Sequence, residues 1–177
     1  MFRSGPVKGA MLGLIGMAAL LGVSALAQGA SANDKHFVRD ALEGGNAEIE
    51  LGHMAQDKGA SDDVKQFGQK MVDDHTKMND KMSQIATQIG ITPPTGKPVA
   101  ATATEGKLKV LSGDAFDKSY IRAMVKDHKD DLAAFKKEIA TTSDPAIKQA
   151  VTDGAQVVAE HLHMIESIAQ KHNVKVD

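Results

Sequence analysis

Four stretches of the chain carry apolar side chains at alternating spacings of three and four residues, the repeat that builds one face of an α-helix. They cover residues 34–58, 62–89, 114–140 and 144–172. At 3.6 residues per turn, each stretch makes about seven or eight turns. The pattern predicts an all-α fold without a β-sheet, in which the four helices pack as one bundle domain over residues 28–177.

Capping and turn residues separate the four stretches. Ser61 is a suitable N-cap for the second stretch, and Asp144 followed by Pro145 is a strong start signal for the fourth. The turns near residues 59–60 and 141–143 are short. The first and second helices are therefore predicted to form one antiparallel pair, and the third and fourth helices another.

A longer connector, residues 91–113, joins the two pairs and is rich in Pro, Thr and Gly. Leu108, Val110 and Leu111 are expected to form a short helical turn that packs on the bundle. The connector is long enough to span the length of such helices, about 40 Å. One long crossover is the ferritin-like arrangement, and a plain up-down-up-down bundle is the alternative.

The first 27 residues are predicted to be a secretory signal peptide rather than part of the fold. Arg3 and Lys8 give a positive start, residues 11–23 are apolar or small, and Ala25 and Ala27 suit a cleavage site. The apolar run is shorter than the roughly 20 residues of a membrane span. We therefore expect export to the periplasm, with secretion or outer-membrane association as alternatives, and no transmembrane span after cleavage.

Composition narrows the chemistry that the exported chain can perform. The sequence has no cysteine, which excludes disulfides, lipoprotein anchoring and thiolate metal sites. Without Arg3 and Lys8, 19 basic residues stand against 23 acidic ones. A nucleic-acid-binding protein normally carries a basic excess, so no nucleic-acid partner is expected. No catalytic residue is predicted, and the interpretation favours a binding or structural protein over an enzyme.

Four ligand-type residues fall on the apolar faces, one in each predicted helix: Glu48, His75, His128 and His161. Each lies far from the ends of its helix, so all four are expected near the middle of the bundle. One carboxylate and three imidazoles suit a single Zn, Fe, Mn or Cu ion, and these metals are not distinguishable from the sequence. The alternative is a buried hydrogen-bond network without metal, in which Glu48 accepts from a protonated histidine.

A short internal repeat adds a third possibility. Residues 71–75 and 124–128 match at four of five positions, and each begins with Met and ends with His. A site formed by Met71, His75, Met124 and His128 would favour Cu(I), although methionines at such positions also serve as core filler. Asp74 and Asp127 precede the two histidines and are candidates to orient them.

The ordered segments FV at residue 37, GGNAEIELG at residue 44, MVDDH at residue 71, LSGDAFDKSY at residue 111 and EHL at residue 160 resemble domain of unknown function family 4142. The resemblance implies an exported bacterial protein, of a kind often labelled "predicted outer membrane protein", with a ferritin-like bundle. It implies no particular activity, protein partner or oligomeric state.

The chain departs from the di-iron pattern of ferritin-like proteins. That pattern has a Glu three residues before each site histidine. Here Val72 stands three residues before His75, and Val158 stands three residues before His161. A carboxylate-bridged di-iron oxidase is therefore not predicted.

Overall fold

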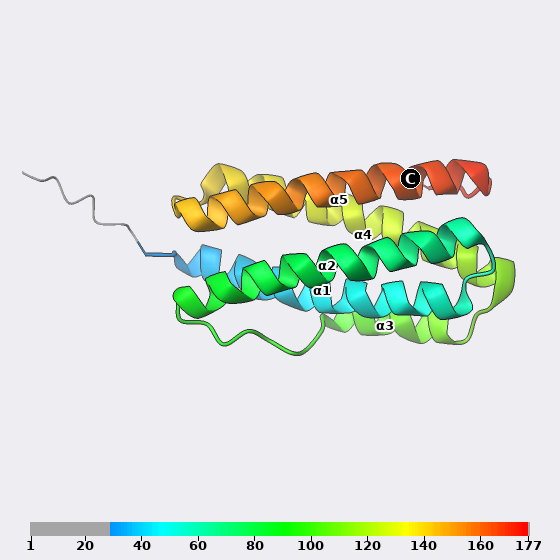
Figure 1. Ribbon diagram of the computed structural model, residues 1–177, viewed down its shortest axis with the longest axis horizontal. Helices are drawn as coiled ribbons and strands as arrows, with labels where there is room; N and C mark the ends of the chain where they lie inside the picture. Colours follow the sequence, from blue (N-terminus) through cyan, green and yellow to red (C-terminus); the bar gives the residue numbers. More distant parts are fainter. Residues whose placement is uncertain (1–28, 177) are drawn as a thin grey trace, which may run out of the picture.

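The computed structural model describes residues 29–176, which form four long helices and one short helix (Figure 1). The helices are α1 (Ala32–Lys58), α2 (Asp62–Gln88), α3 (Val99–Lys109), α4 (Gly113–Thr141) and α5 (Pro145–Lys171). No strand occurs among the described residues, so the all-α prediction is confirmed. The predicted signal peptide, residues 1–27, lies outside the described part of the chain.

The connector differs from its prediction, because the expected single turn is the three-turn helix α3. Side chains of α1 donate hydrogen bonds to the connector and to the end of α3. The amide of Asn46 donates to the carbonyls of Pro94 and Gly96, at 3.2 and 3.1 Å. The Lys58 ammonium donates to carbonyls at the end of α3, including that of Leu111 at 2.9 Å. These bonds hold α3 against the bundle although its apolar face is short.

The long helices pack in the cyclic order α1, α2, α5, α4, in which each contacts its two neighbours. Figure 1 shows α1 and α2 running antiparallel, after which the connector returns along the bundle. As a result, α4 runs in the same direction as α2, and α5 returns antiparallel to α4. The observed topology is the crossover and not the up-down-up-down alternative.

Local capping agrees with the sequence at α5 but not at α2. Asp144 caps α5 by accepting from the backbone N–H groups of Ala146 and Ile147. The Ser61 side chain makes no cap bond to α2. It donates instead to the buried carboxylate of Asp117 on α4, at 2.7 Å. Asp117 thereby fixes the α1–α2 turn against the second helix pair.

The α1–α2 pair is unusually close where two glycines face each other. A Cβ atom on Gly68 would lie 2.6 Å from the carbonyl oxygen of Gly52, and the reverse distance would be 2.7 Å. Both are shorter than a van der Waals contact, so the two backbones touch only because neither residue has a side chain. Two turns earlier in α1, a Cβ on Gly45 would overlap the side chain of Asn79 of α2.

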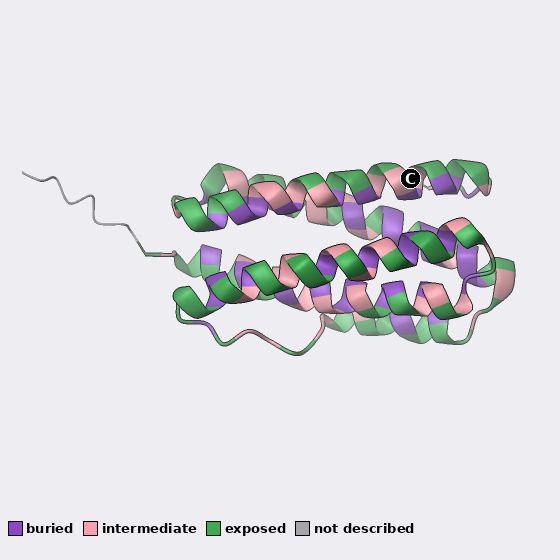
Figure 2. Cartoon of the chain, in the orientation of Figure 1, coloured by how far each residue is buried: buried purple, intermediate pink, exposed green. Residues whose placement is uncertain are grey.

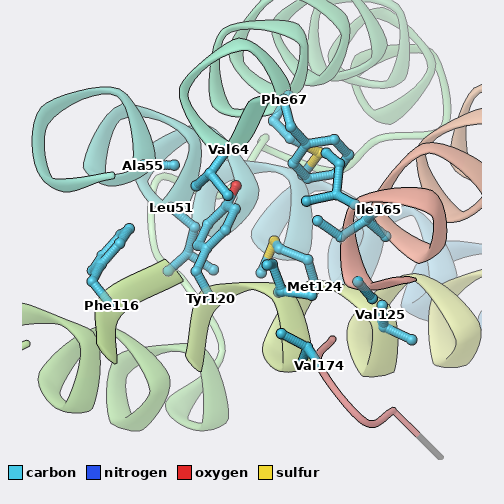
Figure 3. Close-up of a cluster of buried hydrophobic side chains, with 14 of the residues drawn as sticks. Leu51, Ala55, Val64, Phe67, Phe116, Tyr120, Met124, Val125, Ile165 and Val174 are labelled. Carbon is cyan, nitrogen blue, oxygen red and sulfur yellow. The ribbon is translucent and has the colours of Figure 1, made fainter. Parts of the chain in front are cut away.

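Buried residues recur about once per turn on the inward faces of the long helices (Figure 2). They form two apolar clusters. The first surrounds Phe67, Tyr120 and Met124 (Figure 3). The second contains Leu42, Met82, Phe135 and Val151 at the other end of the bundle. In every long helix the ligand-type residue of the predicted site lies in sequence between the two clusters.

Near the N-terminal end of α1, the buried face is shifted by one residue from the face that the apolar spacing predicts. The spacing favours Phe37 and Ala41 as core residues, but the fully buried residues are their neighbours Val38 and Leu42. Phe37 and Ala41 are half-buried because they line a cavity between α1, α2 and α4. None of the helices in residues 29–176 is both long and apolar enough to cross a membrane.

Candidate metal centre

His75 of α2, His128 of α4 and His161 of α5 converge in the layer between the two apolar clusters. One ring nitrogen of each lies within 4.8 Å of the other two. The ring centroids are 5.4 to 6.0 Å apart, and the three residues are at most 3% exposed. Within residues 29–176 no other group of three such side chains is this compact. Because each residue belongs to a different helix, the group exists only in the packed bundle.

Two of the rings have one nitrogen occupied by a hydrogen bond. His128 Nδ1 lies 2.9 Å from the Met124 carbonyl oxygen, and His161 Nε2 lies 3.0 Å from Asp74 Oδ2. A carbonyl and a carboxylate only accept, so these two ring nitrogens carry the protons. The opposite nitrogens, His128 Nε2 and His161 Nδ1, then hold free lone pairs.

The free nitrogens are buried without partners. His75 Nε2, His128 Nε2 and His161 Nδ1 are all inaccessible to solvent and make no hydrogen bond to the described residues. A buried polar atom without a partner is rare in folded proteins, and each one calls for an explanation. Three such nitrogens, one from each ring of a single cluster, form a donor set that a metal ion would satisfy.

All three imidazoles are held in the neutral form. Burial, followed by the neighbouring histidines, lowers the pKa of His75 to about 3. Burial and then His161 lower the pKa of His128 to about 3, although the Met124 carbonyl opposes the shift. Burial also lowers the pKa of His161, against the charge of Asp74. Neutral imidazole is the form that binds metal ions.

The donor set fits a transition-metal ion with modest closure of the side chains. With metal–nitrogen bonds of about 2.0–2.1 Å, nitrogens in a tetrahedral site are roughly 3.3 Å apart. The ring nitrogens, which lie within 4.8 Å of one another, therefore need to approach by up to about 1.5 Å. Three protein nitrogens leave a fourth coordination position open for water or another ligand.

The surroundings close the site on one side and open it on the other. The Phe67 ring lies 6.2 Å from His128 and 6.0 Å from His161, between centroids, and shields the cluster toward the α1–α2 turn. On the other side His75 lines a cavity of about 140 Å³ together with Met78, Met82 and Asp131. The histidine group thus borders this cavity through His75.

Glu48, the fourth predicted ligand, is buried but does not belong to the histidine group. Burial raises its pKa well above the usual range, and the charges of Asp127 and Asp131 add to the shift. Its protonated carboxyl donates a hydrogen bond to Asp127, while Glu48 Oε2 has no partner. Glu48 thus belongs to a neighbouring carboxylate cluster.

The sequence indicates only part of the role of Asp74, because it does not reveal the histidine that Asp74 binds. It placed Asp74 as a candidate to orient His75, its neighbour in the chain. The structure shows it bound to His161, 87 residues away. Met71 and Met124, the sulfur ligands of the alternative site, are both fully buried in the first apolar cluster.

Residues 22–168 match the model of the family described as Domain of unknown function (DUF4142). The chain belongs to this family. The resemblance seen in the sequence is thereby confirmed over most of the chain. No curated protein matches this DUF4142 member.

Solved structures with the same fold include a DUF305 protein from Streptomyces coelicolor, described as a candidate secreted protein. It has a TM-score of 0.69 and 13% identity, covering 81% of this chain and 96% of that one. CopM in its Cu(I)-bound form has a TM-score of 0.66 and 15% identity, covering 78% and 96%. The Cu(II)-bound form of CopM has a TM-score of 0.67 and 17% identity, over the same shares. At these identities the likeness shows the fold alone.

Proposed function

We propose that this DUF4142 protein is an exported metal-binding bundle that holds one transition-metal ion on His75, His128 and His161. The observation that carries the proposal is the set of three buried, neutral ring nitrogens without hydrogen-bond partners. Binding for storage, sensing or stress defence fits such a site better than catalysis, because the compact group in the described residues consists of three imidazoles and includes no nucleophilic side chain.

Copper is the first ion to test. CopM, a protein of the same fold, has been solved with Cu(I) and with Cu(II). Three imidazoles accept either oxidation state, and the open position allows the coordination geometry to change between them. Zn, Fe and Mn are the other candidates.

Two further parts of the proposal concern the cellular location of the protein and its fold family. The signal-peptide pattern in residues 1–27 supports export to the periplasm, as does the likeness to a candidate secreted protein. The crossover between antiparallel pairs supports a ferritin-like classification. The centre nevertheless differs from a di-iron site, because its compact donor group contains imidazoles and no carboxylate.

The competing interpretation is a purely structural network between Glu48 and the histidines. Such a network requires a hydrogen bond from Glu48 to an imidazole. In the described residues Glu48 is bonded to Asp127 instead, and the ring nitrogens are left without partners. A satisfied network would not leave these atoms unpaired, which favours the metal interpretation.

The decisive experiment is a metal titration of the mature chain prepared without a His tag. We expect one bound ion per chain, and a rise in Tm that corresponds to about 2.7 kcal/mol at a ligand concentration of 100 Kd. His128→Leu removes a ligand and should abolish both effects. His163→Leu is the matched control, because His163 is exposed on α5. The proposal fails if none of Cu, Zn, Fe and Mn binds, or shifts the Tm, in a way that His128→Leu abolishes.

A further inference from the structure

A second and larger cavity, about 680 Å³, lies between α1, α3 and α4. Its lining contains five carboxylates, and we call it the acidic chamber: Asp40, Glu43, Glu48, Asp127 and Asp131. All three of Asp40, Glu43 and Glu48 belong to α1, where Asp40 and Glu43 are partly or fully exposed and Glu48 is buried. The histidine group is not part of this lining.

The negative charge of the acidic chamber is not compensated from within. Lys126 is the one basic side chain among the described lining residues, and its ammonium is bound to Asp130 at 2.6 Å. The residues of the α3 side, such as Ala101 and Thr104, are neutral. Lys97, before α3, is paired with Glu50 and Glu105 outside the chamber.

Glu48, which lines the chamber, carries an unsatisfied ligand atom. Glu48 is 2% exposed, and its Oε2 makes no hydrogen bond. Its carboxyl is hydrogen-bonded to Asp127, so oxygens of two carboxyl groups already lie side by side there. Burial, together with the charges of Asp127 and Asp130, also raises the pKa of Asp131 to about 7. Carboxyl groups that crowd one another in this way are relieved by a cation.

We propose that the buried end of the acidic chamber is a second cation site, in which Glu48 and Asp127 bind a hard divalent ion such as Mn²⁺ or Mg²⁺. Ions of this class prefer oxygen ligands, keep several of their waters, and use one or two protein carboxylates. The volume of the chamber accommodates those waters. The ion takes the place of the proton that Glu48 shares with Asp127, and that proton leaves to solvent.

This site differs from the histidine centre in its chemistry and in its residues. Imidazole nitrogens select transition metals such as Cu and Zn, whereas carboxylates and water select Mg and Mn. The two sites also share no ligand residue. The protein is thus a bundle with two cation sites of different preference.

Titration of the full chain with Mn²⁺, followed by the loss of the electron paramagnetic resonance signal of free Mn²⁺, tests the second site. The key variant is Glu48→Gln, because the Gln amide can donate to Asp127 as the protonated Glu48 does and so preserves the fold. Glu160→Gln, on the exposed surface of α5, removes one carboxylate elsewhere. His128→Leu removes the histidine centre.

We expect one Mn²⁺ per chain, displaced by excess Mg²⁺. Glu48→Gln should weaken binding at least tenfold, since loss of even an outer-shell partner costs about 10–100-fold. Glu160→Gln and His128→Leu should retain the Mn²⁺ binding that excess Mg²⁺ displaces. The second site is refuted if Mn²⁺ does not bind, if Glu48→Gln binds it normally, or if His128→Leu abolishes binding. A chain that binds Mn²⁺ through Glu48 but binds no copper or zinc would refute only the proposed histidine centre.

Discussion

The protonated Nε2 of His161 on α5 donates a hydrogen bond of 3.0 Å to Asp74 Oδ2 on α2. Lys70 binds the same carboxylate at 2.8 Å, and Lys77 approaches its other oxygen at 3.5 Å. Burial alone would raise the pKa of Asp74, but the bonds from Lys70 and His161 lower it to about 2. Asp74 is therefore a fixed anion that sets the tautomer of His161 and directs its free nitrogen toward His75 and His128.

Replacing Asp74 with Ala should weaken metal binding by about 10–100-fold, the usual effect of losing a carboxylate that orients a ligand histidine. The Asp73→Ala variant provides the control, since Asp73 is the exposed neighbour and accepts a hydrogen bond from Gln69. Competition with a chelator of known affinity measures the difference. Equal affinities for the two variants would show that Asp74 does not position His161.

The role of the two buried methionines can be tested separately. Met71→Leu combined with Met124→Leu conserves volume, so each change should cost less than about 1.5 kcal/mol. If the three histidines hold the ion, Cu(I) affinity should stay close to that of the unsubstituted chain. A loss of Cu(I) affinity with Zn affinity retained would instead show that the sulfurs are ligands. Parallel Cu(I) and Zn titrations distinguish these results.

The histidine positions could be predicted because they depend on a single helix at a time. The three-four repeat places each of His75, His128 and His161 on an inward face near mid-length, and the structure shows all three there. Glu48 satisfies the same repeat but belongs to another cluster. The repeat gives the face of a helix, whereas the partner that a side chain meets depends on neighbouring helices. For Glu48 that partner is Asp127, which lies off the apolar repeat of α4.

Contacts between elements distant in sequence explain the other differences. The Asp74–His161 bond joins α2 to α5, and the bond from Ser61 to Asp117 replaces a local cap with a carboxylate 56 residues away. No periodicity within one helix indicates either partner. Helix α3 is longer than its sequence predicts for a related reason, because bonds from Asn46 and Lys58 of α1 support a segment whose own apolar pattern is short.

The close approach of α1 and α2 predicts a strong effect of a single methyl group. Gly68→Ala would place its Cβ 2.6 Å from the Gly52 carbonyl oxygen, so the helices must separate. We expect a loss of about 1–3 kcal/mol, the usual range for overpacking a core. In Gly106→Ala, by contrast, the Cβ meets nothing within 4 Å on exposed α3, and improved helix propensity should make it neutral or stabilising by up to about 1 kcal/mol. Urea unfolding of both variants measures the contrast.

A buried pair of carboxyl groups near the end of α4 predicts an unusual pH dependence of stability. Glu138, 6% exposed, is hydrogen-bonded to Asp34 at the start of α1. Burial, that bond and the charge of Asp34 raise the pKa of Glu138 to about 7. Between pH 4.5 and pH 7 the folded chain therefore holds a proton on Glu138 that the unfolded chain has lost. The contribution of Glu138 to stability is largest at pH 4.5 and declines as the pH rises to 7.

Glu138→Gln should remove this dependence while keeping a donor for Asp34. At about pH 8 we expect the variant to be more stable than the unsubstituted chain by on the order of 1 kcal/mol, because it no longer buries a second charge beside Asp34. At pH 4.5 the advantage should vanish, since Glu138 is then protonated in the folded state. Urea unfolding at a series of pH values measures both free energies. Glu160→Gln removes an exposed carboxylate and serves as the control, so its free energy of unfolding should follow that of the unsubstituted chain across the pH series. If Glu138→Gln were equally more stable at the acidic end of the series, the raised pKa could not belong to Glu138.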